Sequence, residues 1–147
     1  MQTFLPDPSF KISAKILDRQ RLGKQRVECL QILKCLSIGP VSENARKTPW
    51  YNHPVCRMWK GHARILLEYM YYICKEWTDR GYIDNCYDKA HDLVCLKTNL
   101  YKENINPLWR KDDRLYSSHR SNLLRKSEYY KRFCWTEQPD MPYFWPI

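Results

Sequence analysis

Apolar residues recur at the spacing of an α-helix through two long stretches of this chain, and no stretch alternates as a β-strand does. In the first stretch, from Ser9 to about Ser37, the apolar positions include Phe10, Ala14, Leu17, Val27, Leu30 and Leu33. In the second, from Pro54 to Asp79, they include Val55, Trp59, Leu66, Tyr69, Met70, Ile73 and Trp77. This period turns the apolar side chains toward one face of each helix. The sequence therefore predicts an all-α fold.

Local signals suggest where these helices begin and end. Ser9 is a suitable N-cap, Pro54 suits a first helical turn, and Gly81 suits the position just after a helix. Gly23, inside the first helix, is expected to bend it or to let another backbone come close. At 147 residues the chain is expected to form a single compact domain over residues 1–147.

The remaining elements are expected to be shorter. Further helices are predicted from about Asp88 to Tyr101 and from His119 to Arg132, which makes about four helices in all. Residues Val41 to Tyr51 are polar and predict a loop. The tail from Pro139 to Ile147 holds three prolines and three aromatic rings, so we expect an extended, aromatic-rich C-terminus.

Composition points to a polyanionic partner. The net charge is +9 and the sequence pI is near 9.2, while aromatic residues make up 14% of the chain. Cations bind phosphates and flat rings stack on exposed bases, so we expect a nucleic acid as the partner. The alternative is that the rings form the core and the charge only aids solubility.

Several classes of protein are excluded or disfavoured. Four glycines are too few for a glycine-rich phosphate loop, and the seven scattered cysteines form no CxxC pair, so we expect free thiols and no metal site. No cofactor is expected. No apolar stretch approaches the roughly 18 residues of a membrane span, and the N-terminus does not resemble a signal peptide, so we expect an intracellular protein without membrane contact.

The run Leu22–Glu28 carries the strongest chemical signal. Lys24 and Glu28 are one helical turn apart and share a face, and Arg21 and Gln25 lie with Glu28 on an overlapping strip. An amine beside a carboxylate can form an imine with an electrophilic carbon while the carboxylate moves protons. The alternative is a surface ion pair between Lys24 and Glu28.

Two further groups suit phosphate binding. Asn52, His53 and Arg57 surround the predicted start of the second helix, where anions are favoured, although ordinary capping would use the same residues. His62 on the apolar strip of that helix is either a core histidine or a pocket residue. The densest polar cluster includes His119, Arg120, Asn122, Arg125 and Lys126. This cluster suits phosphate binding, or it forms a solvated basic face.

Motifs along most of the chain resemble the endonuclease V-type pyrimidine-dimer DNA glycosylases. Leu17-Asp18 followed by Arg26-Val27-Glu28 is similar to the family's Asp…Arg-Glu arrangement. Gly61-His62, the close Asp79–Tyr82 and the aromatic C-terminus also match its layout. The runs Leu22–Glu28, Asn52–Pro54 and Ser118–Lys126 resemble a less characterised branch of the same superfamily.

The resemblance implies an enzyme that acts on double-stranded DNA as a monomer, with neither metal nor cofactor. In this family a terminal α-amine attacks the sugar C1′ of the damaged nucleotide, and a glutamate assists base release and strand cleavage. Carried over by motif, Glu28 is the catalytic carboxylate and Arg26 its cationic neighbour. Val27 separates these two here, which turns Arg26 by about 100° around the helix. A different damaged or modified base is therefore an open alternative to the dimer.

The nucleophile is also open. Family members expose a small second residue after Met removal, whereas Gln2 is large and should keep Met1 in place. The α-amine of Met1, the side chain of Lys24 or a water molecule could each attack. Two other functions stay open as well: a non-enzymatic DNA- or RNA-binding module with a structural Glu28, and an enzyme acting on free nucleotides.

Overall fold

A computed structural model describes residues 1–38, 50–96 and 98–147. These residues form helices and no strand, which confirms the predicted all-α fold. In chain order the elements are α1 (Phe10–Ile16), α2 (Arg19–Ile38), α4 (Pro54–Trp59), α5 (Ala63–Asp79), α6 (Tyr87–Leu96), α7 (Thr98–Tyr101), the 3-10 helix η1 (Leu108–Lys111), α8 (Asp113–Lys126) and the 3-10 helix η2 (Glu128–Phe133).

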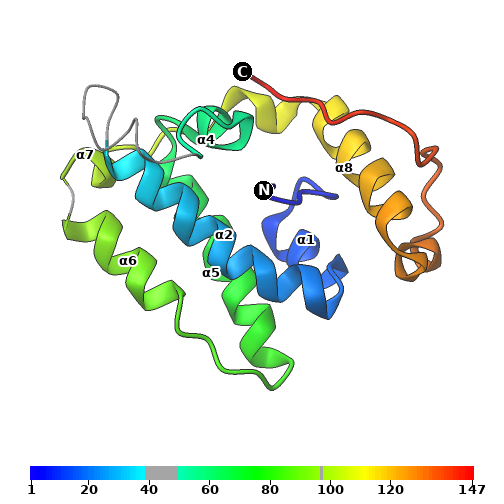
Figure 1. The fold of residues 1–147 in the computed structure, drawn as a ribbon, viewed down its shortest axis with the longest axis horizontal. Coiled ribbons are helices and arrows are strands. Elements are labelled where there is room, and N and C mark those ends of the chain that lie inside the picture. The colour runs from blue at the N-terminus through cyan, green and yellow to red at the C-terminus, as the bar shows by residue number, and fades with distance from the viewer. Residues whose placement is uncertain (39–49, 97) are drawn as a thin grey trace.

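Helices α2 and α5 cross at the centre of the molecule (Figure 1), and α1 and α6 pack against this pair. Their facing side chains form one core, in which Leu22, Ile32, Leu66, Tyr69 and Ile73 are fully buried. Burial of such side chains removes apolar area from water and stabilises the helix pair. Val27 does not belong to this core, since it is 44% exposed.

The first predicted helix is divided in two, because the chain leaves the helical conformation at Leu17. The Leu17 backbone is extended (φ −66°, ψ 137°) while its side chain is fully buried. The next backbone N–H, of Asp18, donates to the hydroxyl of Tyr130 at 3.1 Å. A hydrogen bond from a residue far along the chain thus replaces the bond that a continuous helix would make.

The second predicted helix is also divided, between α4 and α5. Lys60 leaves the helical conformation and Gly61 adopts a φ of +85°, which favours glycine. The side chain of Glu103 accepts the backbone N–H of Ala63 at 3.3 Å. The prediction of one continuous helix was therefore wrong here, although Pro54 does occupy the first turn of α4.

The last predicted helix begins earlier than expected. Helix α8 starts after Asp112, whose carboxylate accepts the N–H of Arg114 at 3.0 Å. It ends at Lys126, and the residues that follow form η2. Other predicted ends agree: Ser9 caps α1 and Gly81 follows α5 with a φ of +97°.

The predicted third helix appears as α6 and α7, with residue 97 between them outside the described ranges. Most of the predicted loop over Val41–Tyr51 also lies outside them. Gly23 lies inside the uninterrupted helix α2. It admits the indole of Trp77, because a Cβ at Gly23 would lie 2.8 Å from Trp77 Cη2.

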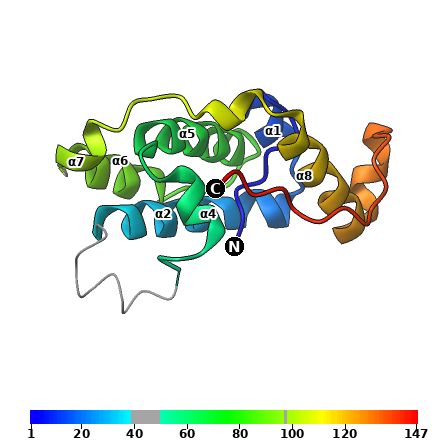
Figure 2. The same ribbon diagram turned by 90° about the horizontal axis from the view of Figure 1, so that it is seen from above.

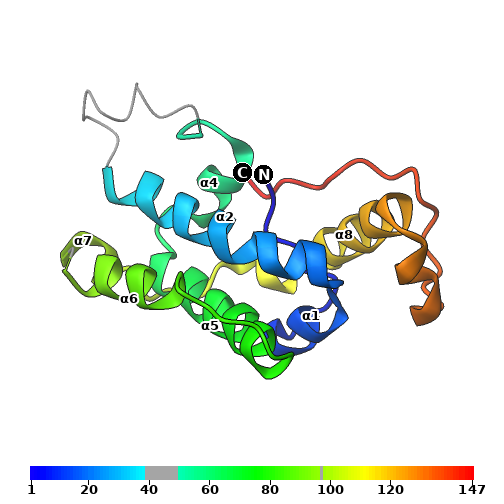
Figure 3. The ribbon, with the colours of Figure 1, turned by 60° about the horizontal axis from the view of Figure 1, so that its bottom comes forward.

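The N-terminal segment and the C-terminal tail lie on the same side of the molecule. The N-terminal segment lies over α2 between α4 and α8, as Figures 2 and 3 show from two directions. The C-terminal tail returns along α8 toward α4 without regular structure, as predicted. Asn122 Nδ2 donates to the carbonyl of Met141 at 3.0 Å, and Ser118 Oγ accepts the N–H of Phe144 at 3.1 Å.

All seven cysteines are free, and five of them are buried. Within the described ranges, no helix has both the length and the apolar character to span a membrane. In the same ranges, no cluster of three or more His, Cys, Asp or Glu side chains could hold a metal ion.

Candidate active site

The N-terminal segment is held in an extended conformation by side chains from other helices. The backbone N–H of Gln2 donates to Glu28 Oε2 at 3.2 Å, and that of Phe4 donates to Gln25 Oε1 at 3.0 Å. The N–H of Leu5 donates to His119 Nδ1 at 2.8 Å. These bonds satisfy the buried backbone of a segment that has no strand partner, and they hold Gln2, Phe4 and Leu5 against α2 and α8.

Glu28 is the acidic group at the centre of this arrangement. Its side chain is 9% exposed, and Oε2 also accepts a hydrogen bond from Gln25 Nε2 at 3.1 Å. The Lys24 ammonium lies 3.6 Å from Oε1 and is 73% exposed. Because the Lys24 side chain remains in water, this ion pair is worth about 1 kcal/mol or less.

A pocket of about 240 Å³ opens over Glu28. Its walls come from the N-terminal segment, α2, α8 and the C-terminal tail. The lining residues are Met1, Gln2, Phe4, Gln20, Arg21, Lys24, Gln25, Glu28, Lys126 and Tyr143. The pocket therefore combines one carboxylate, the α-amine end of the chain, several cations and two aromatic rings.

The cations around the pocket affect one another. Burial lowers the pKa of Lys126, and the positive charges of Arg21, Arg125 and Lys24 lower this pKa further, against an opposing effect of Glu28. Burial also raises the pKa of Tyr143 to about 12. Such a crowded positive rim is favourable for a polyanion and costly without one.

His53 lies beside the same region but does not line the pocket. Its Nδ1 accepts the N–H of Val55 at 3.1 Å and so caps α4, as the alternative interpretation expected. The ring packs edge-on against Trp50 and Trp145. Burial lowers the pKa of His53, and the nearby positive terminus of Met1 lowers it further.

The structure does not bring Arg26 to Glu28. The Arg26 guanidinium lies 2.6 Å from Asp84 Oδ1 and 4.7 Å from the ring centre of Trp77. It therefore points away from the pocket, because residues two positions apart project in different directions from a helix. The hydrogen bond from Arg26 and two backbone N–H groups lower the pKa of Asp84, against the effect of burial.

The cluster on α8 is largely internal. His119 is fully buried and Asn122 is 1% exposed, and burial lowers the pKa of His119 to about 3. Arg120 donates to the carbonyl of Pro6 at 2.9 Å and pairs with Glu137. His119 and Asn122 are therefore buried and not exposed at a helix start. These two side chains and that of Arg120 connect the two chain ends to α8.

Arg125 and Lys126 follow on the exposed end of α8, where Arg125 donates to Asn122 Oδ1. Arg125 lies near enough to the pocket to affect the pKa of Lys126. These two are the members of the cluster whose charges reach the pocket.

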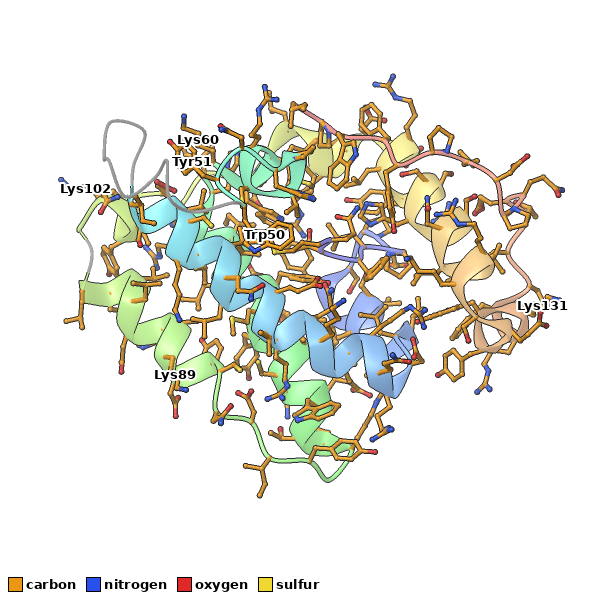
Figure 4. The ribbon with its side chains drawn as sticks, viewed as in Figure 1. Trp50, Tyr51, Lys60, Lys89, Lys102 and Lys131 are labelled. Carbon is orange, nitrogen blue, oxygen red and sulfur yellow. The ribbon has the colours of Figure 1, made fainter. Side chains whose placement is uncertain are left out.

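Other predicted phosphate ligands lie elsewhere. Asn52 and Arg57 line a second pocket of about 430 Å³, and His62 Nδ1 lies 2.6 Å from the carbonyl of Ile105. Lys60, which lines the second pocket, and Lys131 on η2 lie far apart on the molecule (Figure 4). The positive charge is therefore spread over the surface as well as gathered at the first pocket.

Sequence reasoning did not select four of the pocket residues: Gln2, Phe4, Gln20 and Tyr143. Gln20 shares the helical strip of Lys24 and Glu28, so helical spacing was a usable signal for it. The sequence holds no comparable signal for Gln2, Phe4 and Tyr143, because they reach the pocket from the two ends of the chain.

The fold and the pocket define a class of small helical protein in which an amine end of the chain lies beside a buried carboxylate under a rim of cations. The pyrimidine dimer DNA glycosylase family model matches residues 1–90, more than half of the 147-residue chain. The chain belongs to this family, whose members act on DNA that contains pyrimidine dimers. No curated protein and no solved structure matches it.

Proposed function

We propose that the protein is a DNA glycosylase with AP lyase activity, which excises a damaged or modified pyrimidine-type base from double-stranded DNA. The α-amine of Met1 is the proposed nucleophile, and Glu28 is the proposed proton carrier. The observation that carries this proposal is the 3.2 Å hydrogen bond from the backbone N–H of Gln2 to Glu28 Oε2, which holds the first residue beside the carboxylate in the pocket.

Met1 is a better candidate than Lys24 on two grounds. Reference pKa values are about 8 for an α-amine and about 10.4 for a lysine side chain, so an α-amine is more often neutral at neutral pH. Lys24 is 73% exposed, whereas the backbone of Gln2 holds the first residue beside Glu28. Lys24 instead joins Arg21 and Lys126 as a cation for the DNA backbone.

The proposed reaction has two stages. The neutral amine attacks C1′, and its new bond to C1′ forms as the bond from C1′ to the base nitrogen breaks. The base leaves with that electron pair and takes a proton from solvent. Glu28 accepts the proton that the amine loses and passes it to the sugar ring oxygen, so the ring opens to an imine.

Strand cleavage follows from the imine. Glu28, which is again a carboxylate, accepts a C2′ proton. The electron pair of that C–H bond forms a double bond between C2′ and C3′ as the bond from C3′ to its oxygen breaks, and the 3′ phosphate leaves. Water then hydrolyses the imine and restores the amine. We propose that the enzyme does this as a monomer inside the cell.

Borohydride reduction tests the proposal directly. Wild-type protein should become covalently attached to duplexes that carry a pyrimidine dimer or an abasic site, and mass spectrometry should map the adduct to Met1. Glu28→Gln should still bind DNA but lose about 100-fold or more in turnover. Lys24→Gln is the matched control, and it should still be trapped through Met1.

Three outcomes would overturn the proposal. An adduct on Lys24 would move the nucleophile to that side chain. Salt-dependent binding without base release, strand cleavage or trapping on any of these duplexes, and without an effect of Glu28→Gln, would favour the non-enzymatic binding module instead. Turnover of free nucleotides alone would favour the third alternative.

A further inference from the structure

We propose that the side-chain amide of Gln2 reads the base in the pocket, by donating a hydrogen bond to one of the carbonyl oxygens of that base. Gln2 is then a specificity-determining residue. This inference rests on the proposed glycosylase function and adds the kind of base edge that the site accepts.

Gln2 is held firmly in the pocket wall. The residue is 5% exposed, and its backbone donates to Glu28 Oε2 at 3.2 Å and accepts from Gln25 Nε2 at 2.7 Å. Its side-chain oxygen, Oε1, accepts the backbone N–H of Thr3 at 2.9 Å. These bonds fix both the position of the residue and the orientation of its amide.

The amide nitrogen of Gln2 has no such partner. Nε2 is buried, and no acceptor in residues 1–38, 50–96 or 98–147 lies within hydrogen-bonding distance of it. A buried N–H donor without a partner is unfavourable, and native structures rarely keep one. Gln2 is one of the residues that line the pocket, whose volume of about 240 Å³ admits a ligand.

A pyrimidine base carries hydrogen-bond acceptors, which this donor lacks in the folded protein. Thymine and uracil present carbonyl oxygens at O2 and O4, and cytosine presents one at O2. Enzymes that act on a base hydrogen-bond to its edge and stack its faces on aromatic side chains. Phe4 and Tyr143 line the same pocket and supply rings for stacking.

Gln2 also lies next to the residues of the proposed reaction. Its own backbone N–H binds Glu28, so a base held by Gln2 lies near the carboxylate and the amine of Met1. A site built to hydrogen-bond a substrate rejects analogues that lack the matching group far better than an apolar site does. The donor therefore favours bases with an acceptor at this edge.

A comparison of two DNA substrates separates base reading from the rest of the reaction. One duplex carries a pyrimidine dimer, and the other carries an abasic site, which has no base for Gln2 to contact. In Gln2→Met and in Gln2→Asn, the ratio of glycosyl-bond cleavage at the dimer to abasic-site cleavage should fall about tenfold. Both new side chains are large enough to keep Met1 in place.

Gln31→Met is the matched control, because Gln31 lies exposed on the same helix as Glu28 and should keep the wild-type ratio. An unchanged ratio in both Gln2 variants overturns the inference. Equal loss of both activities also overturns it, since Gln2 would then act only by placing Met1 and Glu28. Wild-type protein that neither cleaves nor is trapped on abasic-site DNA overturns the proposed function itself.

Discussion

Gln25 and Glu28, one turn apart on α2, hold the backbone of Gln2 from two sides. Gln25 Nε2 donates to the Gln2 carbonyl at 2.7 Å, and Glu28 Oε2 accepts the Gln2 N–H at 3.2 Å. The two side chains also bond to each other at 3.1 Å. A helix face thus fixes a chain end that has no secondary structure of its own.

Gln25→Met should destabilise the protein and loosen the N-terminal segment. The substitution leaves the N–H of Phe4 and the carbonyl of Gln2 buried without their partner, which should cost about 3 kcal/mol of unfolding free energy. Urea unfolding would measure this loss. Gln31→Met, on the exposed face of the same helix, should stay within about 0.5 kcal/mol of wild type. Equal stabilities of the two variants would contradict this account.

Arg26→Gln should reduce stability, while base release per folded molecule is retained. The variant leaves Asp84 buried without its charged partner, a change that typically costs about 3–5 kcal/mol. Two backbone N–H groups still bind Asp84, so we expect the lower end of this range. Thermal unfolding and single-turnover assays on saturating DNA would check both parts. Lost base release at unchanged stability would instead place Arg26 in the reaction.

His119 should make the stability of the protein depend on pH. The folded-state pKa of about 3 lies below the ordinary value of 6.5, so the unfolded chain binds a proton first as the pH falls. The contribution is complete above pH 6.5 and is lost progressively toward pH 3, by about 1.4 kcal/mol per pH unit.

Comparison with His119→Asn would isolate this effect, because the Asn oxygen can still accept the N–H of Leu5 but does not titrate. Between pH 7 and pH 5 the unfolding free energy of the wild type should fall by about 2 kcal/mol more than that of the variant. If the unfolding free energies of the two proteins, measured in urea, changed in parallel with pH, His119 would not be the cause of the pH dependence of stability.

Gly23→Ala should destabilise the protein although alanine favours helices. The new methyl group would lie 2.8 Å from Trp77 Cη2, and that indole is held by the stacked ring of Tyr82 and by a bond to the carbonyl of Ile83. The cost of overpacking should exceed the gain in helix propensity, so the unfolding free energy should fall by about 1 kcal/mol. In a double-mutant cycle, Trp77→Phe should remove most of this penalty, and simple additivity would argue against the contact.

Much of the candidate site could be predicted from one helix. Spacing alone placed Arg21, Lys24, Gln25 and Glu28 on two overlapping strips of one helix, and these four residues do line one pocket. The carry-over by motif did not predict that Arg26 pairs with Asp84, because a motif does not say which tertiary neighbour a side chain meets. The sequence also did not indicate that His119 is fully buried, because its neighbours in the sequence are polar.

The sequence by itself determined the helical class, because apolar periodicity and caps such as Ser9 act within a few residues. It also determined the excess of positive charge, which is a property of composition. Tertiary structure decided where the two long helices break and which residues complete the pocket. Those outcomes depend on hydrogen bonds such as Gln2 to Glu28 and Leu5 to His119, which join residues 26 and 114 positions apart. Local patterns carry no information about such distant pairs. Only the tertiary structure therefore shows that the N-terminal segment lies beside Glu28.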